Sequence, residues 1–192
     1  MPESGQAVGA GWGMQRVFPC ALSPERYEQT QAHRTVRAEA VCPRCGEAAG
    51  LQRHGSYLRW ITGEAGRCLR ICIARFWCRA CGGTVSYLPD FALPYRLVAV
   101  ASFGAYLEGR HERAVQCWQG RLREYRRQME AFAVRLLRCV GCGLGRAPPQ
   151  GGQVWPWLKE ACGSLGAAAR ELVGTFRIGL FKRYQCHQPA GP

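Results

Sequence analysis

Two short pieces, Cys42-Pro-Arg-Cys45-Gly46 and Cys78-Arg-Ala-Cys81-Gly82, decide the fold that we predict for this chain of 192 residues. Each is a Cys-x-x-Cys pair followed by glycine. In a tight turn this spacing aims both sulfurs at one metal ion, and glycine relieves the strain of the turn. Two such turns supply the four sulfurs of a closed tetrahedral site. The sequence therefore predicts one Zn²⁺ bound by Cys42, Cys45, Cys78 and Cys81.

The segment between the two pairs is predicted to form a small β-sheet. Residues 55–61 are a plausible strand, residues 63–66 a turn, and residues 70–78 a second strand with period-2 character. A hairpin or a three-stranded sheet in this segment would bring the two cysteine turns together. This combination predicts a zinc ribbon. The alternative for each Cys-x-x-Cys is a redox-active pair or a pair of buried thiols.

Three other side chains in this segment are weaker candidates for ligands. Cys72 would lie about 20 Å along the strand from Cys78, too far to share one ion, so we interpret it and Cys68 as small sheet residues. His54 could replace a sulfur, but four cysteines already close the site. Four thiolates do not by themselves distinguish zinc from iron. We favour zinc because nothing else in the sequence indicates electron transfer.

The second half of the chain has a helical pattern. Residues 97–107 suit a buried helix, residues 112–119 a short second helix, and Gly120 a break. Apolar residues then repeat at intervals of three and four up to about Arg138, which predicts an amphipathic helix. A short helix, a turn with glycine and a basic helix are the pattern of a helix-turn-helix.

The C-terminal part offers one more cysteine pair and one more helix. Cys139 and Cys142 have no second complete pair beside them, so we interpret the glycines around them as the end of the basic helix and leave a second metal site open. A linker with two prolines follows. Pro156 can then start a last helix, whose apolar stripe reaches Phe176.

The net charge favours a polyanionic partner. The chain carries 26 Lys and Arg against 13 Asp and Glu, a formal charge of +13, and all but two of these basic residues are arginine. Such a surface attracts nucleic acid, although acidic substrates and anionic lipid remain alternatives. The candidate contacts with nucleic acid are Arg44 and Arg79 beside the cysteine turns and Arg121, Arg123, Arg126, Arg127, Arg135 and Arg138 on the basic helix.

The acidic residues exclude several classes of enzyme. Asp90 is the only aspartate and there is no asparagine, which excludes two-metal sites built from several aspartates and leaves only Asp90 for a Ser-His-Asp triad. A structural role for Asp90, capping a turn or pairing with an arginine, is the simpler interpretation. Sites built from glutamate alone survive this argument, but we expect a protein without catalytic activity.

The remaining features concern location and organisation. No apolar run approaches the roughly 18 residues of a membrane span, and the N-terminus lacks the pattern of a secretory signal, so we expect a cytoplasmic protein that does not bind membranes. We expect a mixed α+β fold, a small β-rich zinc ribbon followed by a helix-turn-helix-like region, with disordered termini. The predicted segments are a mostly disordered stretch over 1–39, the ribbon and a proline-containing connector over 40–96, the basic helical region over 97–146, and a linker, helix and frayed tail over 147–192.

The stretch from Cys42 to Arg96 resembles a bacterial zinc-ribbon family of unknown function that is similar to the N-terminal region of insertion-sequence transposases. The resemblance is carried by the two cysteine pairs, by Arg53-His-Gly-Ser-Tyr-Leu-Arg59, by Ser86-Tyr-Leu-Pro-Asp-Phe and by Leu-Pro-Tyr-Arg96. It implies a metal-bound module that contacts DNA. Because the segment after Pro149 has two glutamates and no aspartate, the resemblance implies a stand-alone DNA-binding protein or a remnant of a mobile element, without strand-transfer activity.

Two functions follow from these observations. The first is a zinc-ribbon protein that binds duplex DNA, with affinity that falls steeply with salt. The alternative is a zinc-dependent module for protein interaction or RNA binding, with Trp60, Phe76 and Trp77 as stacking or docking surfaces. Self-association stays open in both cases, and a thiol oxidoreductase is the least favoured reading.

Overall fold

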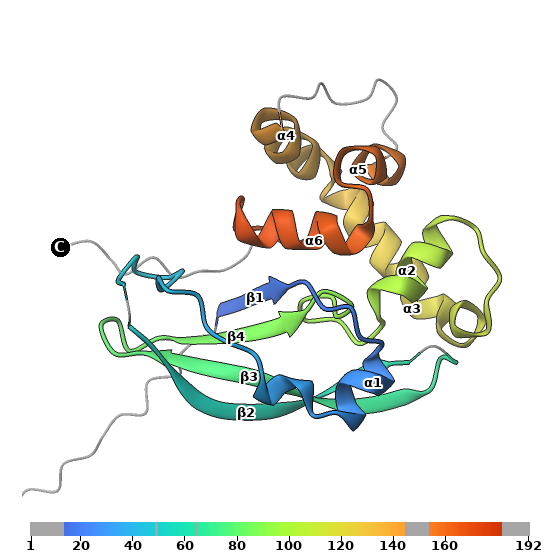
Figure 1. Ribbon diagram of the computed structural model, residues 1–192. Coiled ribbons are helices and arrows are strands. Elements are labelled where there is room, and N and C mark those ends of the chain that lie inside the picture. Colours follow the sequence, from blue (N-terminus) through green and yellow to red (C-terminus); the bar gives the residue numbers. More distant parts are fainter. Residues whose placement is uncertain (1–13, 49, 64, 145–153, 182–192) are drawn as a thin grey trace, which may run out of the picture.

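The chain folds into a four-stranded sheet with helices packed against it (Figure 1). The computed structural model describes residues 14–48, 50–63, 65–144 and 154–181, with Cys139 and residues 142–144 described by backbone alone. The strands are β1 (Met14–Phe18), β2 (Leu51–Thr62), β3 (Cys68–Cys78) and β4 (Thr84–Pro89), in the order β1-β4-β3-β2. The helices are α1 (Pro24–Gln29), the 3-10 helix η1 (Ala32–Arg34), α2 (Val100–Leu107), α3 (Arg113–Ala131), α4 (Ala133–Leu144), α5 (Val154–Cys162) and α6 (Leu165–Gly174). The predicted mixed α+β fold is confirmed.

The hairpin of β2 and β3 positions the cysteine turns. The two strands are antiparallel, with Thr62 opposite Cys68 at one end and Leu51 opposite Cys78 at the other. The second turn begins at Cys78, and Leu51 follows shortly after the first turn. The hairpin register therefore brings the two turns to the same end of the sheet, as the sequence predicts. The strands are longer than predicted, and a bulge at Gly55, which has a φ of 85°, interrupts β2.

The expectation of disorder over residues 1–39 is wrong from residue 14 onward. Strand β1 pairs in parallel with β4, from Met14 opposite Val85 to Phe18 opposite Pro89. Helix α1 follows and contacts β3, with Tyr27 only 1% exposed and its ring edge-on to Phe91 at 5.4 Å between centroids. This segment contributes apolar side chains that cover the apolar side chains of the small sheet. Residues 1–13 lie outside the described residues.

Helix α3 is continuous where the sequence indicates a break. It runs from Arg113 through Gly120 to Ala131, so the helix-turn-helix with its turn at Gly120 is not formed. A glycine inside a helix costs only about 1 kcal/mol relative to alanine. Burial of one face of α3, which includes Leu122 and Met129, outweighs that cost. The predicted basic helix also ends earlier, because Phe132 caps α3 and the chain continues in α4.

The predicted C-terminal helix is divided in two. Helix α5 ends at Cys162, Gly163 has a φ of 80°, and the Ser164 hydroxyl accepts a hydrogen bond from the Ala167 N–H at the start of α6. A glycine in the left-handed region ends a helix, and a serine N-cap starts the next one. In Figure 1, α6 lies beside β1, which it also contacts. The predicted linker and the frayed tail fall mainly or wholly outside the described residues.

Most of the apolar core lies among the helices. The largest buried cluster joins α2 to α6 and includes Phe103, Leu122, Leu136, Leu158 and Leu172, each 0% exposed. Two smaller clusters lie against the sheet. In the part of the chain that the structure describes, no helix has both the length and the apolar character that a membrane span requires.

The continuity of α3 leads to a prediction about two glycines. We expect Gly120→Ala to stabilise the protein by about 0.5–1 kcal/mol, because a Cβ there meets nothing within 4 Å and alanine favours the helix. We expect Gly66→Ala to destabilise it by about 1–3 kcal/mol, because Gly66 has a φ of 76° and its Cβ would lie 2.9 Å from the Ala114 Cα. Urea denaturation followed by circular dichroism measures both. A destabilising Gly120→Ala would mean that α3 is broken at that position.

Candidate metal centre

The first cysteine turn is closed by backbone hydrogen bonds. The Gly46 N–H donates to the Cys42 carbonyl at 2.9 Å, and the Cys42 N–H donates to the Glu47 carbonyl at 2.8 Å. Gly46 has a φ of 78°, in the left-handed region that glycine adopts without strain. The glycine after the second cysteine therefore has the role that the sequence predicts for it.

The second turn repeats the first one bond for bond. The Gly82 N–H donates to the Cys78 carbonyl at 2.9 Å, and the Cys78 N–H donates to the Gly83 carbonyl at 2.9 Å. Gly82 has a φ of 63°. The two turns are also joined, since the Arg79 N–H donates to the Gly50 carbonyl at 3.0 Å. Two matching turns thus meet at the end of the β2–β3 hairpin.

The four sulfurs fit one ion. The Sγ atoms of Cys42, Cys45, Cys78 and Cys81 all lie within 4.8 Å of one another. Four sulfurs at about 2.3 Å from a central ion in a tetrahedron are about 3.8 Å apart, and the Cys45 and Cys78 Sγ atoms are 3.7 Å apart. That separation is far too long for a disulfide, whose sulfurs lie about 2.05 Å apart. The site could therefore hold a metal ion such as zinc.

The backbone around the sulfurs favours thiolate ligands in part. Donation by backbone N–H groups, chiefly that of Cys81, lowers the pKa of the Cys78 thiol to about 7. Burial has the opposite effect on two other thiols. It raises the pKa of Cys42, although hydrogen bonds from the N–H groups of Cys45 and Arg44 act to lower it. It raises the pKa of Cys81 to about 12. Four neighbouring thiols cannot all become thiolates without a compensating positive charge. A divalent metal ion at their centre would supply that charge, and thiolates are ligands that such an ion binds.

Burial differs between the two members of each pair. Cys42 and Cys78 are 1% and 0% exposed, whereas Cys45 is exposed and Cys81 half-buried. The first cysteine of each turn is thus buried, and the second is more accessible to solvent. Gly50 packs close to this centre, because a Cβ there would lie 3.1 Å from the Cys78 Sγ.

The other predicted candidates lie away from this cluster. Cys68 and Cys72 are side chains of β3 and do not belong to the four-sulfur group, as expected. His54 is on β2, with its ring 6.5 Å from that of Trp77, and is not part of the group either. The side chains of Cys139 and Cys142 fall outside the described residues, so a second site there stays untested.

Asp90 has the structural role that the sequence indicates. One carboxylate oxygen accepts a hydrogen bond from the Cys20 N–H at 3.1 Å, and the other accepts one from the Arg170 guanidinium. The side chain thus joins the end of β4 to the segment before α1 and to α6. These two contacts give the only aspartate of the sequence a structural role.

The predicted nucleic-acid contacts form two groups. Arg44 lies against the second turn, because a Cβ on Gly83 would collide with its guanidinium, and Arg79 is exposed in that turn. The others are on α3 and α4, and α3 meets the opposite end of the hairpin, where the Trp118 indole donates to the Gly66 carbonyl at 2.7 Å. Because β3 has 11 residues, the two ends of the hairpin are roughly 35 Å apart.

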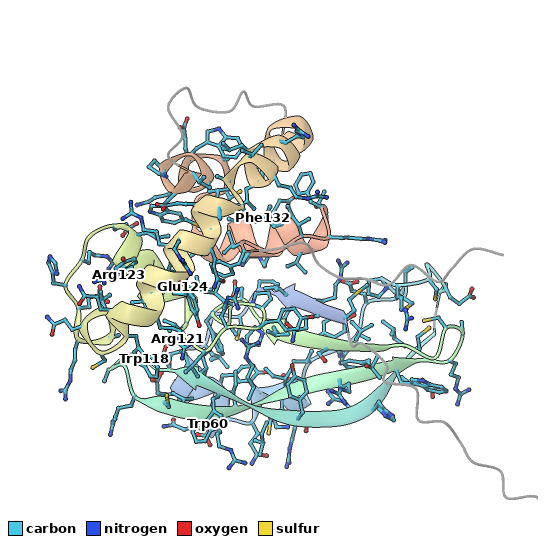
Figure 2. The ribbon with its side chains drawn as sticks, turned by 180° about the vertical axis from the view of Figure 1, so that it is seen from behind. Trp60, Trp118, Arg121, Arg123, Glu124 and Phe132 are labelled. Atoms are coloured by element: carbon cyan, nitrogen blue, oxygen red, sulfur yellow. The ribbon has the colours of Figure 1, made fainter. Side chains whose placement is uncertain are left out.

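The arginines of the helical group are not equivalent. Arg126 pairs with Glu130 at 2.7 Å and Arg127 with Glu124 at 2.7 Å. Arg121 and Arg123, labelled on the same helix in Figure 2, are also exposed. No carboxylate among the described residues pairs with either of them. On α4, Arg138 is exposed and Arg135 is half-buried. The predicted arginines thus fall into those that already pair with a carboxylate and those that are free of one among the described residues. A count of charges in the sequence does not separate them.

The stretch that contains the four cysteines matches one family model. Residues 42–117 are similar to a domain of unknown function, DUF6431. The match runs from the first candidate ligand to the early part of α3. It includes both cysteine turns, the hairpin, β4 and α2, but neither β1 nor the basic half of α3.

No curated protein and no solved structure matches the chain. Nothing in these comparisons links the DUF6431 domain to transposases, so that part of the expected resemblance has no support. The comparisons thus show a similarity to a domain of unknown function over a stretch that contains the four-cysteine cluster.

Some residues that build the site were not predicted. Glu47 and Gly83 accept the bond that closes each turn, and Gly50 gives room to a sulfur. The repeated spacing offers a signal for the first two, since each lies five residues after the first cysteine of its turn. No local signal marks Gly50, because its role depends on the meeting of two distant turns.

Proposed function

We propose that this chain is a zinc-stabilised module that binds duplex DNA through surface arginines. The proposed metal is Zn²⁺, because four sulfurs in a closed tetrahedron are a ligand set of structural zinc sites. Such a site has no open position for a metal-bound water. Its role would be to hold the two cysteine turns together, and binding free energy would become folding free energy. This supports a binding role rather than a catalytic one.

The DNA-binding part rests on one observation, the exposed arginines that no carboxylate neutralises. Arg121 and Arg123 on α3 and Arg79 in the second turn are of this kind among the described residues. Unpaired guanidinium groups bind phosphate oxygens well, in a fork geometry that suits them. With the formal charge of +13, they favour a polyanion over other partners.

The length of the hairpin also suits a duplex. Its two ends lie roughly 35 Å apart, and one turn of B-DNA repeats at about 34 Å. One duplex along the hairpin could therefore present phosphates one helical turn apart, to the second cysteine turn at one end and to α3 at the other. The four thiolates and a dication would leave a net charge of about −2 at the metal centre, which the neighbouring Arg44 and Arg79 offset.

Salt dependence tests the proposal. We expect the zinc-loaded full chain to bind a fluorescent duplex of about 25 base pairs, with a log–log dependence of affinity on salt near −4 if four to five phosphates are contacted. Fluorescence anisotropy at several salt concentrations measures the slope. We expect the double change Arg121→Gln and Arg123→Gln to reduce the slope by about 2.

The matched control changes two ion-paired arginines of the same helix. Arg126→Gln with Arg127→Gln alters the net charge equally, but these side chains are already engaged by Glu130 and Glu124, so we expect a smaller change in slope. No binding, or binding that is insensitive to salt, would contradict the proposal.

A protein-interaction module is the second candidate, favoured by one surface. Leu58 and Trp60 are 53% and 56% exposed, on the same side of β2, which pairs only with β3 among the described strands. The Arg70 guanidinium lies over the Trp60 ring at 5.7 Å. Exposed apolar side chains on an edge strand are typical of docking surfaces. Concentration-dependent self-association without DNA binding would favour this candidate.

A further inference from the structure

A groove lined by basic residues lies beside the metal centre. It has a volume of about 630 Å³, and its walls are residues 34–40 on one side and the start of the hairpin on the other, with Leu51, Arg53 and Phe76. Ala40 precedes the first cysteine turn closely, and Leu51 lies opposite Cys78. The groove therefore opens next to the four cysteines.

Three arginines line this groove and only one carboxylate does. Arg34, Arg37 and Arg53 are exposed, and no carboxylate of the described residues pairs with them. Glu39 is the one acidic residue in the lining, and Arg16 already binds it, with 2.9 Å between the guanidinium and a carboxylate oxygen. The groove thus keeps an uncompensated positive charge.

The Arg53 side chain has several partners in the wall of the groove. Its guanidinium donates to the carbonyls of His33, Arg34 and Val36, at 3.2, 3.0 and 2.8 Å. It also lies over the Phe76 ring, 5.2 Å from the centroid. These contacts fix the position of one positive charge and tie residues 33–36 to the hairpin. The pKa of the neighbouring His33 is lowered, mainly by burial and further by the positive charges of Arg34 and Arg53.

The lining selects phosphates rather than bases. Phe76 is only 5% exposed and Arg53 covers its ring, so the groove offers no free aromatic face on which a base could stack. What it offers instead is three arginines in its lining, Arg34, Arg37 and Arg53. Several positive charges in one groove suit the repeated negative charges of a sugar–phosphate strand.

We propose that the groove formed by residues 34–40, Leu51, Arg53 and Phe76 binds one phosphate strand of duplex DNA, with Arg34 and Arg37 as its phosphate contacts. This inference rests on the DNA-binding function proposed above. It adds a contact site formed by a segment that the sequence predicts to be disordered. It also places the metal beside the DNA, where it would keep the hairpin wall of the groove in register.

The test compares two double variants with equal loss of charge. Arg34→Gln with Arg37→Gln changes the groove, and Arg26→Gln with Arg67→Gln changes two exposed arginines that do not line it. Anisotropy with the same fluorescent duplex gives affinity and salt slope for each. We expect the groove variant to lose about tenfold or more in affinity at moderate salt and about 2 in slope. We expect the control to lose about threefold or less.

The outcomes separate the two proposals. Equal effects of both variants, with tight binding by the unchanged chain, would overturn the groove as a contact site while the DNA-binding function stands. Failure of the unchanged chain to bind duplex DNA would overturn both. The metal content of the groove variant, measured in parallel, must equal that of the unchanged chain, because Arg34 and Arg37 lie outside the cysteine turns. A variant that loses its metal is replaced by Arg37→Gln alone, which must still bind more weakly than Arg67→Gln alone.

Discussion

Cys78→Ser is expected to remove the metal and to lower the free energy of unfolding by about 5 kcal/mol or more. Cys78 is 0% exposed, its Sγ lies 3.7 Å from that of Cys45, and it begins the second turn. Serine is a poor zinc ligand and would leave a buried hydroxyl among three thiols. The hairpin end would lose the link that holds it to residues 42–50. Thermal unfolding followed by circular dichroism, with metal analysis of the same sample, measures the effect.

Cys68→Ser is the matched control. Cys68 is on the same strand, is exposed, and does not belong to the four-sulfur group. We expect it to keep the metal and to change stability by less than about 0.5 kcal/mol, as a surface substitution does. Similar losses for Cys68→Ser and Cys78→Ser would mean that the cysteines act through packing and not through a shared ion.

Asp90→Ala is expected to destabilise the protein by about 2–3 kcal/mol. The carboxylate is 17% exposed, accepts the Cys20 N–H at 3.1 Å and binds Arg170 of α6. Alanine would leave a partly buried N–H without its acceptor and remove the link between sheet and helix. Urea denaturation gives the change in free energy, with an unchanged m-value as the sign of an intact folded state.

Asp90→Asn separates the two bonds of this side chain. The amide oxygen can still accept from the Cys20 N–H, but the charge that attracts Arg170 is gone. We therefore expect a loss of about 1 kcal/mol, well below that of alanine. If asparagine and alanine were equally harmful, the charge would be the main contribution. If neither had an effect, Asp90 would not join the sheet to α6.

The cysteine centre and the hairpin could be predicted because their signals are local. The geometry of a Cys-x-x-Cys-Gly turn is set by its own five residues. Gly46 and Gly82 have positive φ values, which glycine adopts without the strain that other residues would have. The β2–β3 hairpin follows from period-2 strands around a glycine turn. Its register, with Leu51 opposite Cys78, then brings the turns together.

Strand β1 could not be predicted because it depends on a distant partner. Its sequence, Met14-Gln-Arg-Val-Phe18, alternates weakly and is only five residues long. It becomes a strand by pairing in parallel with β4, which begins about 70 residues later. Tyr27 likewise becomes a core residue only against the folded sheet. Local composition favoured disorder in both places.

The helix boundaries were wrong for a related reason. The predicted break at Gly120 is absent, because burial of the apolar face of α3 exceeds the small cost of one glycine. The predicted single C-terminal helix is divided at Gly163, which has the left-handed φ that ends a helix. Whether a glycine breaks a helix depends on the packing around it, and a single sequence does not contain that packing.

The central claim, four thiolates gathered on one ion, is tested most directly by elemental analysis of the full chain purified without chelator. The account predicts one equivalent of zinc per chain, retained in Cys68→Ser and Cys72→Ser and lost in Cys45→Ser and Cys81→Ser. The last two are chosen because they are the less buried ligands, so their replacement disturbs the core least. A well-folded chain without metal, or zinc that stays bound after Cys45 or Cys81 is replaced, would contradict it.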